Sequence, residues 1–140
     1  MSAETQTAEP DSRSERNTPF YRLGGHRTMR AIVERFYDLM QRDPAYAELR
    51  AMHAPDLGPM RESLALFLAG WSGGPRDWFE QNPGKCMMSA HKGLVINREV
   101  AAQWAEAMTR AIEDAGIADV ELSRAMAGVL GDLARGMGRT

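Results

Sequence analysis

Three histidines and one cysteine are the residues of this chain best suited to metal or nucleophilic chemistry. His26, His53 and His91 include no pair at the four-residue spacing that clamps zinc on one helix face. Cys86 stands alone, which excludes an intrachain disulfide and a zinc site built from several thiolates. Although Cys86 lies near His91, no third group is evident that would orient them as nucleophile and base. The sequence therefore argues against a zinc hydrolase and a thiol enzyme.

A second group of residues suits a flat apolar cofactor. Haem requires a neutral imidazole on one side of its iron, a dry apolar slot, and hydrogen-bond donors facing the open coordination position. His91 follows a long loop and supplies the imidazole, while Tyr37 and Trp104 lie on predicted helices and supply donors. Each residue also has an ordinary interpretation, as a loop histidine or as aromatic residues packed in a core. Residue types alone leave both interpretations open.

The composition describes one soluble domain. The chain has 140 residues, 44% of them hydrophobic and 26% charged, with a formal net charge of −2. Acidic and basic residues are interspersed, which argues against a nucleic-acid surface or an anionic-membrane patch. No apolar run is long enough for a membrane span or a signal peptide, and the single cysteine fits a reducing cytoplasm. We expect a cytoplasmic protein with a mobile polar tail over residues 1–18 and a folded domain over residues 19–140.

The elements that position these residues are predicted to be helices. From Thr18 onward the apolar residues recur with helical spacing, and no stretch alternates as a strand does. The predicted helices cover residues 25–43, 45–52, 61–71 and 97–115, with a last one from Asp119 to the glycines at 136 and 138. Asp56 and Asn97 are placed as helix caps. Residues 75–87 lack a sustained period, which predicts an extended loop with one helical turn at most.

Local segments and their spacing resemble the truncated haemoglobins, and among them the second group. The resemblance covers residues 19–112 and rests on PFYRLGG (19–25), RFY (35–37), LFL (66–68) and WSGGP (71–75). Two double glycines in these places are typical of the family. His91 precedes Trp104 at the spacing of the family's proximal histidine and distal tryptophan. This joint pattern is far more specific than any one of its residues.

The resemblance implies an all-α, globin-like fold, a truncated two-over-two helical sandwich in which the helix before the iron ligand is mostly loop. It implies haem b as cofactor and His91 as the proximal iron ligand. The residues implied to stabilise a distal ligand are Tyr37, Trp104 and His53. A second protein ligand to the iron, from His53 or Met88, stays open at this point.

The family pattern also implies which residues surround the haem. The expected pocket residues are Met60, Leu64, Phe67, Trp78, Met87 and Ile96. Met60 stands where an ordinary haemoglobin has its distal histidine, and a thioether cannot donate a hydrogen bond. Lys85 and Lys92 are candidates for contacts with the haem carboxylates, or else solvated loop side chains. Ala90 and Gly93-Leu94 stand where relatives often have a basic residue and a Pro-Phe pair, so the family's contacts with the haem edge at these positions do not carry over.

The function implied is reversible binding of a diatomic gas, with oxygen ahead of nitric oxide and carbon monoxide, for transport, storage or sensing. The alternative is a haem enzyme that dioxygenates nitric oxide with the help of a reductase, or one that acts on peroxide. A remote alternative is a cofactor-free helical interaction module. We expect no nucleic-acid or membrane partner, and a monomer or a homodimer.

Overall fold

The computed structural model describes residues 18–85 and 96–138. Its helices, in chain order, are α2 (Pro19–Leu23), α3 (Gly25–Arg42), the 3₁₀ helix η1 (Pro44–Tyr46), α4 (Ala47–Ala51), α5 (Gly58–Trp71), α6 (Asp77–Gln81), α8 (Arg98–Asp114) and α9 (Val120–Met137). Within these ranges the chain forms helices and connecting loops, and no strand. None of the described helices is long and apolar enough to cross a membrane.

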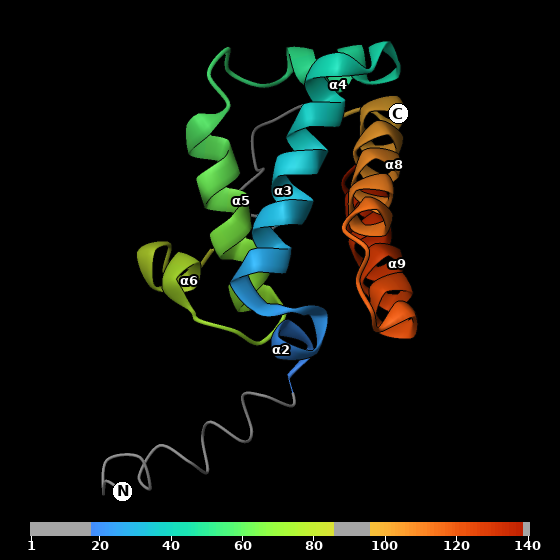
Figure 1. The fold of residues 1–140 in the computed structure, drawn as a ribbon. Helices are drawn as coiled ribbons and strands as arrows, with labels where there is room; N and C mark the ends of the chain where they lie inside the picture. Colours follow the sequence, from blue (N-terminus) through green and yellow to red (C-terminus); the bar gives the residue numbers. More distant parts are fainter. Residues whose placement is uncertain (1–17, 86–95, 139–140) are drawn as a thin grey trace, which may run out of the picture.

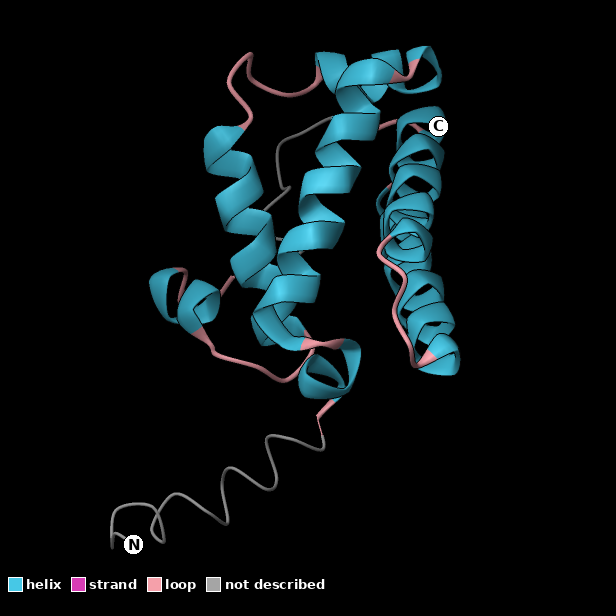
Figure 2. Cartoon of the chain, viewed as in Figure 1, coloured by secondary structure: helices cyan, strands magenta, loops and turns pink. Residues whose placement is uncertain are grey.

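The long helices form two packed pairs. Helices α3 and α5 lie side by side, α8 and α9 form the second pair, and α3 packs on α8 to join them (Figure 1). Short helices close the ends, with α4 at one end and α2 and α6 toward the other (Figure 2). The predicted all-α, two-over-two globin-like fold is confirmed.

Helix α3 has the apolar face that its sequence predicts. The buried residues on this face are Met29, Ile32, Val33, Phe36, Tyr37, Leu39 and Met40. Their spacing of three and four residues places them on one stripe, which packs against α5 and α8. The helix ends at Arg42, two residues before Pro44, whose ring does not permit the helix to continue.

The predicted caps of the two C-terminal helices are confirmed. The Asn97 side chain accepts a hydrogen bond from the Val100 N–H at 2.8 Å, at the start of α8. The Asp119 side chain accepts one from the Leu122 N–H at 3.1 Å, at the start of α9. Each cap satisfies an amide of the first turn, which has no partner within the helix.

Two helices differ from the sequence prediction. Helix α2 was not predicted; it is a five-residue turn with proline in its first turn, too short for a periodic signal. Helix α5 begins at Gly58 rather than at residue 61, and the Asp56 carboxylate accepts the Gly58 N–H at 2.9 Å. Helix α9 ends at Met137, between the two glycines where its end was predicted.

Two glycines permit the tight approach of α2 to the rest of the fold. Gly24 joins α2 to α3 with φ of 117°, and a Cβ there would lie 2.0 Å from the Thr28 hydroxyl oxygen. Gly74 faces the Phe20 ring, where a Cβ would lie 2.6 Å from a ring carbon. The left-handed φ at Gly24 would strain any other residue at the turn from α2 to α3, and a side chain at Gly74 would push the Phe20 ring of α2 away. These double-glycine segments therefore have a steric role in the fold.

Candidate functional site

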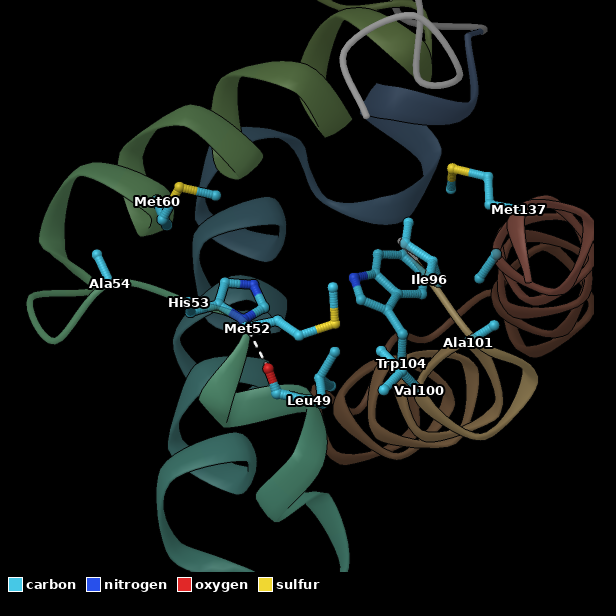
Figure 3. Close-up of a pocket in the computed structure, with 11 residues that line it drawn as sticks. Leu49, Met52, His53, Ala54, Met60, Ile96, Val100, Ala101, Trp104 and Met137 are labelled. Carbon is cyan, nitrogen blue, oxygen red and sulfur yellow. Dashed lines mark hydrogen bonds between the residues drawn. The ribbon is translucent and has the colours of Figure 1, made fainter. Parts of the chain in front are cut away.

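A cavity of about 190 Å³ opens between the α4 end of the molecule and the α8–α9 pair. Its lining residues are Leu49, Met52, His53, Ala54, Met60, Ile96, Val100, Ala101, Trp104, Ala134 and Met137 (Figure 3). Most of these side chains are aliphatic or thioether groups, and the imidazole and the indole supply the polar atoms. An apolar cavity with a small number of polar groups is the usual form of a cofactor or small-molecule site.

Trp104 projects from α8 into this cavity. Its ring packs edge-on against Phe36, with ring centroids 5.3 Å apart. The indole nitrogen lies on the side of the ring that faces His53 (Figure 3). No hydrogen bond between described residues uses this N–H, whereas every fully buried side-chain nitrogen and oxygen among them has a partner. The N–H of Trp104 therefore faces open space, where it can donate to a bound molecule.

His53 follows α4 and is oriented by the backbone of that helix. Its Nδ1 lies 2.9 Å from the Leu49 carbonyl oxygen (Figure 3). A carbonyl oxygen can only accept, so this bond places a proton on Nδ1. The imidazole also packs edge-on against Tyr37, with ring centroids 6.0 Å apart. His53 thus links the cavity to the buried tyrosine of α3.

Tyr37 lies in the core directly behind His53. The side chain is 2% exposed and is not among the residues that line the cavity. Burial raises the pKa of its phenol to about 12, and the positive charge of Arg61 opposes this shift only in part. Its hydroxyl has no hydrogen-bond partner among the described residues. Like the indole N–H, the hydroxyl is a neutral donor that the described protein leaves unused.

Arg61 fixes Tyr37 from the solvent side. Its guanidinium carbon lies 5.6 Å from the centre of the Tyr37 ring, a cation–π arrangement. The same guanidinium donates to the carboxylates of Glu34 and Asp38 and to Gln41 Oε1, the last two at 3.2 Å. Because Arg61 lies on α5 and its partners lie on α3, these bonds hold the two helices together beside Tyr37.

The other residues expected in the haem pocket lie in two separate parts of the fold. Met60 and Ile96 line the cavity, and the Met60 side chain is 40% exposed at its edge. Phe67 and Trp78 instead pack edge-on against each other at 5.1 Å, and the Trp78 indole donates to the Ser63 hydroxyl at 3.1 Å. Leu64 packs against the core, and it is not among the residues that line the cavity.

Several expected site residues lie outside the described part of the chain. These are the predicted iron ligand His91, the pocket residue Met87, the candidate second iron ligand Met88 and the carboxylate contact Lys92. Lys85, the other predicted carboxylate contact, is described and is exposed beyond α6. Its exposed side chain is compatible with both interpretations, a contact with a haem carboxylate and a solvated loop lysine. The predicted tail, residues 1–17, is also outside the described ranges.

The sequence analysis missed most of the walls of the cavity. The residues it did not name are Leu49, Met52, Ala54, Val100, Ala101, Ala134 and Met137. Val100 and Ala134 belong to buried stripes of α8 and α9. A helical stripe identifies which residues are buried, but it cannot tell a residue that faces a cavity from one that faces a neighbouring helix. The sequence therefore indicated that Val100 and Ala134 are buried, but it did not indicate that they face a cavity.

The chain has relatives among the solved structures. A cold-adapted truncated hemoglobin from the Antarctic marine bacterium Pseudoalteromonas haloplanktis is 28% identical, with 89% of this chain and 99% of that chain covered and a TM-score of 0.83. A group II 2-on-2 hemoglobin from the plant pathogen Agrobacterium tumefaciens is also 28% identical, covering 87% and 94%, with a TM-score of 0.82. A hemoglobin from Chloroflexus aurantiacus is 28% identical, covering 88% and 98%, with a TM-score of 0.78.

Among curated proteins, no sequence matches this chain. The family model described as bacterial-like globin matches residues 18–137, from the start of the described fold almost to its end. The predicted resemblance to truncated haemoglobins, with group II members among the structural neighbours, is confirmed by these matches. The chain therefore belongs to the bacterial-like globin family, a family of haem proteins.

Proposed function

We propose that this globin holds haem b with His91 as the iron ligand and reversibly binds a diatomic gas, with oxygen as the principal ligand. Three observations support the proposal. The family match covers residues 18–137, the cavity between α4 and the α8–α9 pair is apolar, and two neutral donors in or beside it have no partner among the described residues. The role of His91 rests on the sequence pattern and the family.

The described residues fit a haem. A porphyrin needs apolar walls, which Leu49, Val100 and Ile96 provide. It also needs room, and the small side chains of Ala101 and Ala134 leave space where α8 and α9 face the cavity. The polar groups of the lining are few and local, as expected for a site that must exclude water from a flat apolar cofactor.

When bound, a haem supplies an iron atom that takes up a diatomic gas. The protein contributes hydrogen-bond donors for that gas. Trp104 donates from its indole N–H, and Tyr37 donates from a hydroxyl whose pKa of about 12 keeps it protonated throughout the physiological range. Met60 lines the edge of the cavity in which the gas would bind, and its thioether cannot donate a hydrogen bond.

One observation carries the proposal furthest. The indole nitrogen of Trp104 faces His53 across an apolar cavity, and the described protein gives it no acceptor. A core tryptophan that is buried for packing alone normally finds a partner for its N–H. An indole left without one, at the wall of a cavity, indicates that a ligand completes the arrangement.

A visible spectrum tests the proposal. Purified protein, supplemented with haem, is expected to show a Soret band that shifts on reduction and again on addition of carbon monoxide. His91→Gly is expected to lose this native ligation, whereas the matched variant His26→Gly, at an exposed position of α3, keeps it. Absence of any Soret band in the wild-type protein would contradict the proposal.

A second measurement separates gas binding from enzymatic use of the gas. The oxygen-loaded protein is mixed with nitric oxide in the presence of a physiological reductant. A single stoichiometric oxidation is the result expected of an oxygen carrier. Sustained turnover would replace this function by nitric oxide dioxygenation.

A further inference from the structure

Gln103 occupies the position before Trp104 on α8, and its side chain reaches the short helix α4. Its Oε1 accepts a hydrogen bond from the Leu49 N–H at 3.0 Å. Its Nε2 donates to the Glu48 carboxylate at 3.1 Å. Both ends of one amide are therefore used to hold α4 against α8.

The bonds of Gln103 continue to His53 through a single residue. The Leu49 N–H donates to Gln103, and the Leu49 carbonyl accepts from His53 Nδ1 at 2.9 Å. Leu49 is itself buried and lines the cavity. A displacement of Leu49 therefore moves the acceptor of the imidazole relative to Trp104 on α8.

Helix α4 depends on such support because it is too short to hold itself. It spans five residues, and isolated helices of that length are unstable in water. Leu49 lies near its N-terminus, where helix amides have no acceptor within the helix. Gln103 supplies the acceptor, so its loss would leave an amide of α4 unpaired beside the cavity.

The neighbouring element η1 has its own attachment to α8. The Tyr46 hydroxyl donates to the Glu106 carboxylate at 2.8 Å. Arg110 donates to the same hydroxyl at 3.0 Å and to Asp43 at 2.8 Å. Loss of Gln103 would thus loosen α4 and leave the preceding turn in place.

We infer that Gln103 is a positioning residue that fixes His53 relative to Trp104 and thereby controls how long a ligand stays in the cavity. The inference rests on the proposed function, because it assigns Gln103 a part in ligand retention. Gln103 does not line the cavity. Gln103 is linked to His53 through the hydrogen bonds of Leu49, and it is next to Trp104 in the sequence of α8. It therefore connects the positions of these two cavity residues.

Gln103→Leu tests the inference, because it keeps similar bulk and removes both hydrogen bonds. Amide exchange of the full chain, followed by NMR, is expected to show at least about tenfold faster exchange at Leu49, with little change along α8. The His53 Nδ1 resonance is expected to shift as its acceptor moves. In the haem-loaded protein, oxygen release is expected to become roughly fivefold faster.

Exchanging the side chains of Gln103 and Glu48 preserves the total charge and provides a rescue experiment. Gln103→Glu alone keeps an acceptor for Leu49 but sets a second carboxylate against Glu48, so release is expected to accelerate. In the double variant Gln103→Glu with Glu48→Gln, the amide at position 48 donates to the carboxylate at position 103. The hydrogen bond between the two positions is thus restored with donor and acceptor exchanged. The double variant is expected to return both Leu49 exchange and oxygen release to within about twofold of wild type. These variants also test the inference if Gln103→Leu does not fold.

Ala102→Leu is the matched control, since this exposed residue precedes Gln103 on the same helix. It is expected to leave Leu49 exchange and oxygen release unchanged. Faster exchange at Leu49 with unaltered oxygen release in Gln103→Leu would overturn the inference and leave the proposed function intact. Failure of the double variant to restore release would also overturn it. Failure of the wild-type protein to bind haem would overturn the proposed function, and this inference with it.

Discussion

Two buried tyrosines of the core have opposite surroundings. Tyr46 is 0% exposed and Tyr37 is 2% exposed, and each has an arginine over its ring, at 5.8 Å and 5.6 Å respectively. The hydroxyl of Tyr46 donates to Glu106 and accepts from Arg110. The hydroxyl of Tyr37 has no partner among the described residues. Burial and the neighbouring arginine are shared, so hydrogen bonding is what separates the two.

The difference distinguishes a tyrosine that serves the fold from one that serves a ligand. A hydroxyl that protein groups pair fully contributes to stability, whereas one without a protein partner is available to another molecule. Tyr46 joins η1 to α8, which is a structural role. Tyr37 keeps an unused donor near His53. Since every fully buried side-chain oxygen of the described residues has a partner, the Tyr37 hydroxyl keeps some accessible surface, where a bound molecule can supply an acceptor.

The largest effect is expected from removing the paired hydroxyl. Tyr46→Phe should lower the free energy of unfolding by about 2 kcal/mol, because it breaks two hydrogen bonds to charged groups. Oxygen release should stay close to wild type. Urea unfolding measures the first quantity, and Tyr21→Phe, at a 44% exposed tyrosine, is the control. If Tyr46→Phe lowers the free energy of unfolding no more than the control does, the structural role assigned to the Tyr46 hydroxyl is wrong.

Removing the unpaired hydroxyl should produce the reverse pattern. Tyr37→Phe is expected to leave the free energy of unfolding within about 0.5 kcal/mol of wild type, since no protein hydrogen bond is lost. Oxygen release should become roughly tenfold faster, because the ligand loses a donor. Stopped-flow displacement of oxygen by carbon monoxide measures the rate. A rate equal to that of wild type would show that the hydroxyl does not face the ligand.

A smaller change is expected from the second donor. Trp104→Phe keeps an aromatic ring beside Phe36 and removes the indole N–H, so oxygen release should become roughly threefold faster. Trp71→Phe, at the end of α5, is the matched control and should leave the rate unchanged. Equal rates in the wild-type protein and Trp104→Phe would refute the proposed indole bond.

A last effect is confined to alkaline pH. The pKa of Tyr37 is raised from 10.0 to about 12 in the folded protein, because burial disfavours the phenolate. Between these values the unfolded chain loses this proton and the folded one keeps it, so the free energy of unfolding falls as pH rises. The contribution is fully present below pH 10. Tyr37→Phe should therefore flatten the decline, as measured by urea unfolding at a series of pH values.

Much of the fold follows from local features of the sequence. The stripe from Met29 to Met40 predicts α3, and the positions of Asn97 and Asp119 predict the starts of α8 and α9. These signals are local because helix periodicity and capping involve residues within a few positions of one another. The differences lie where the periodic signal is weak: α2 spans only five residues, and the first turn of α5 precedes the apolar stripe from which the helix was predicted.

The site was predicted less completely. Trp104, His53 and Met60 were named from the family pattern, and the structure places all three around one cavity. Phe67 and Trp78 were also expected around the haem; their rings pack against each other, Trp78 also packs against Phe79, and neither residue lines this cavity. An apolar aromatic residue satisfies either environment equally well, so its type does not reveal which one it occupies.

Residue types in the sequence predict the long helices, the Asn97 cap, the double glycines and the family. Each of these depends on residue types at short spacing. Only the tertiary structure decided which donors are left open, because that depends on whether an acceptor from another helix comes within reach. Nothing local distinguishes Tyr46 from Tyr37. Arg110 and Glu106 of α8 meet the hydroxyl of the first, and no described residue meets that of the second.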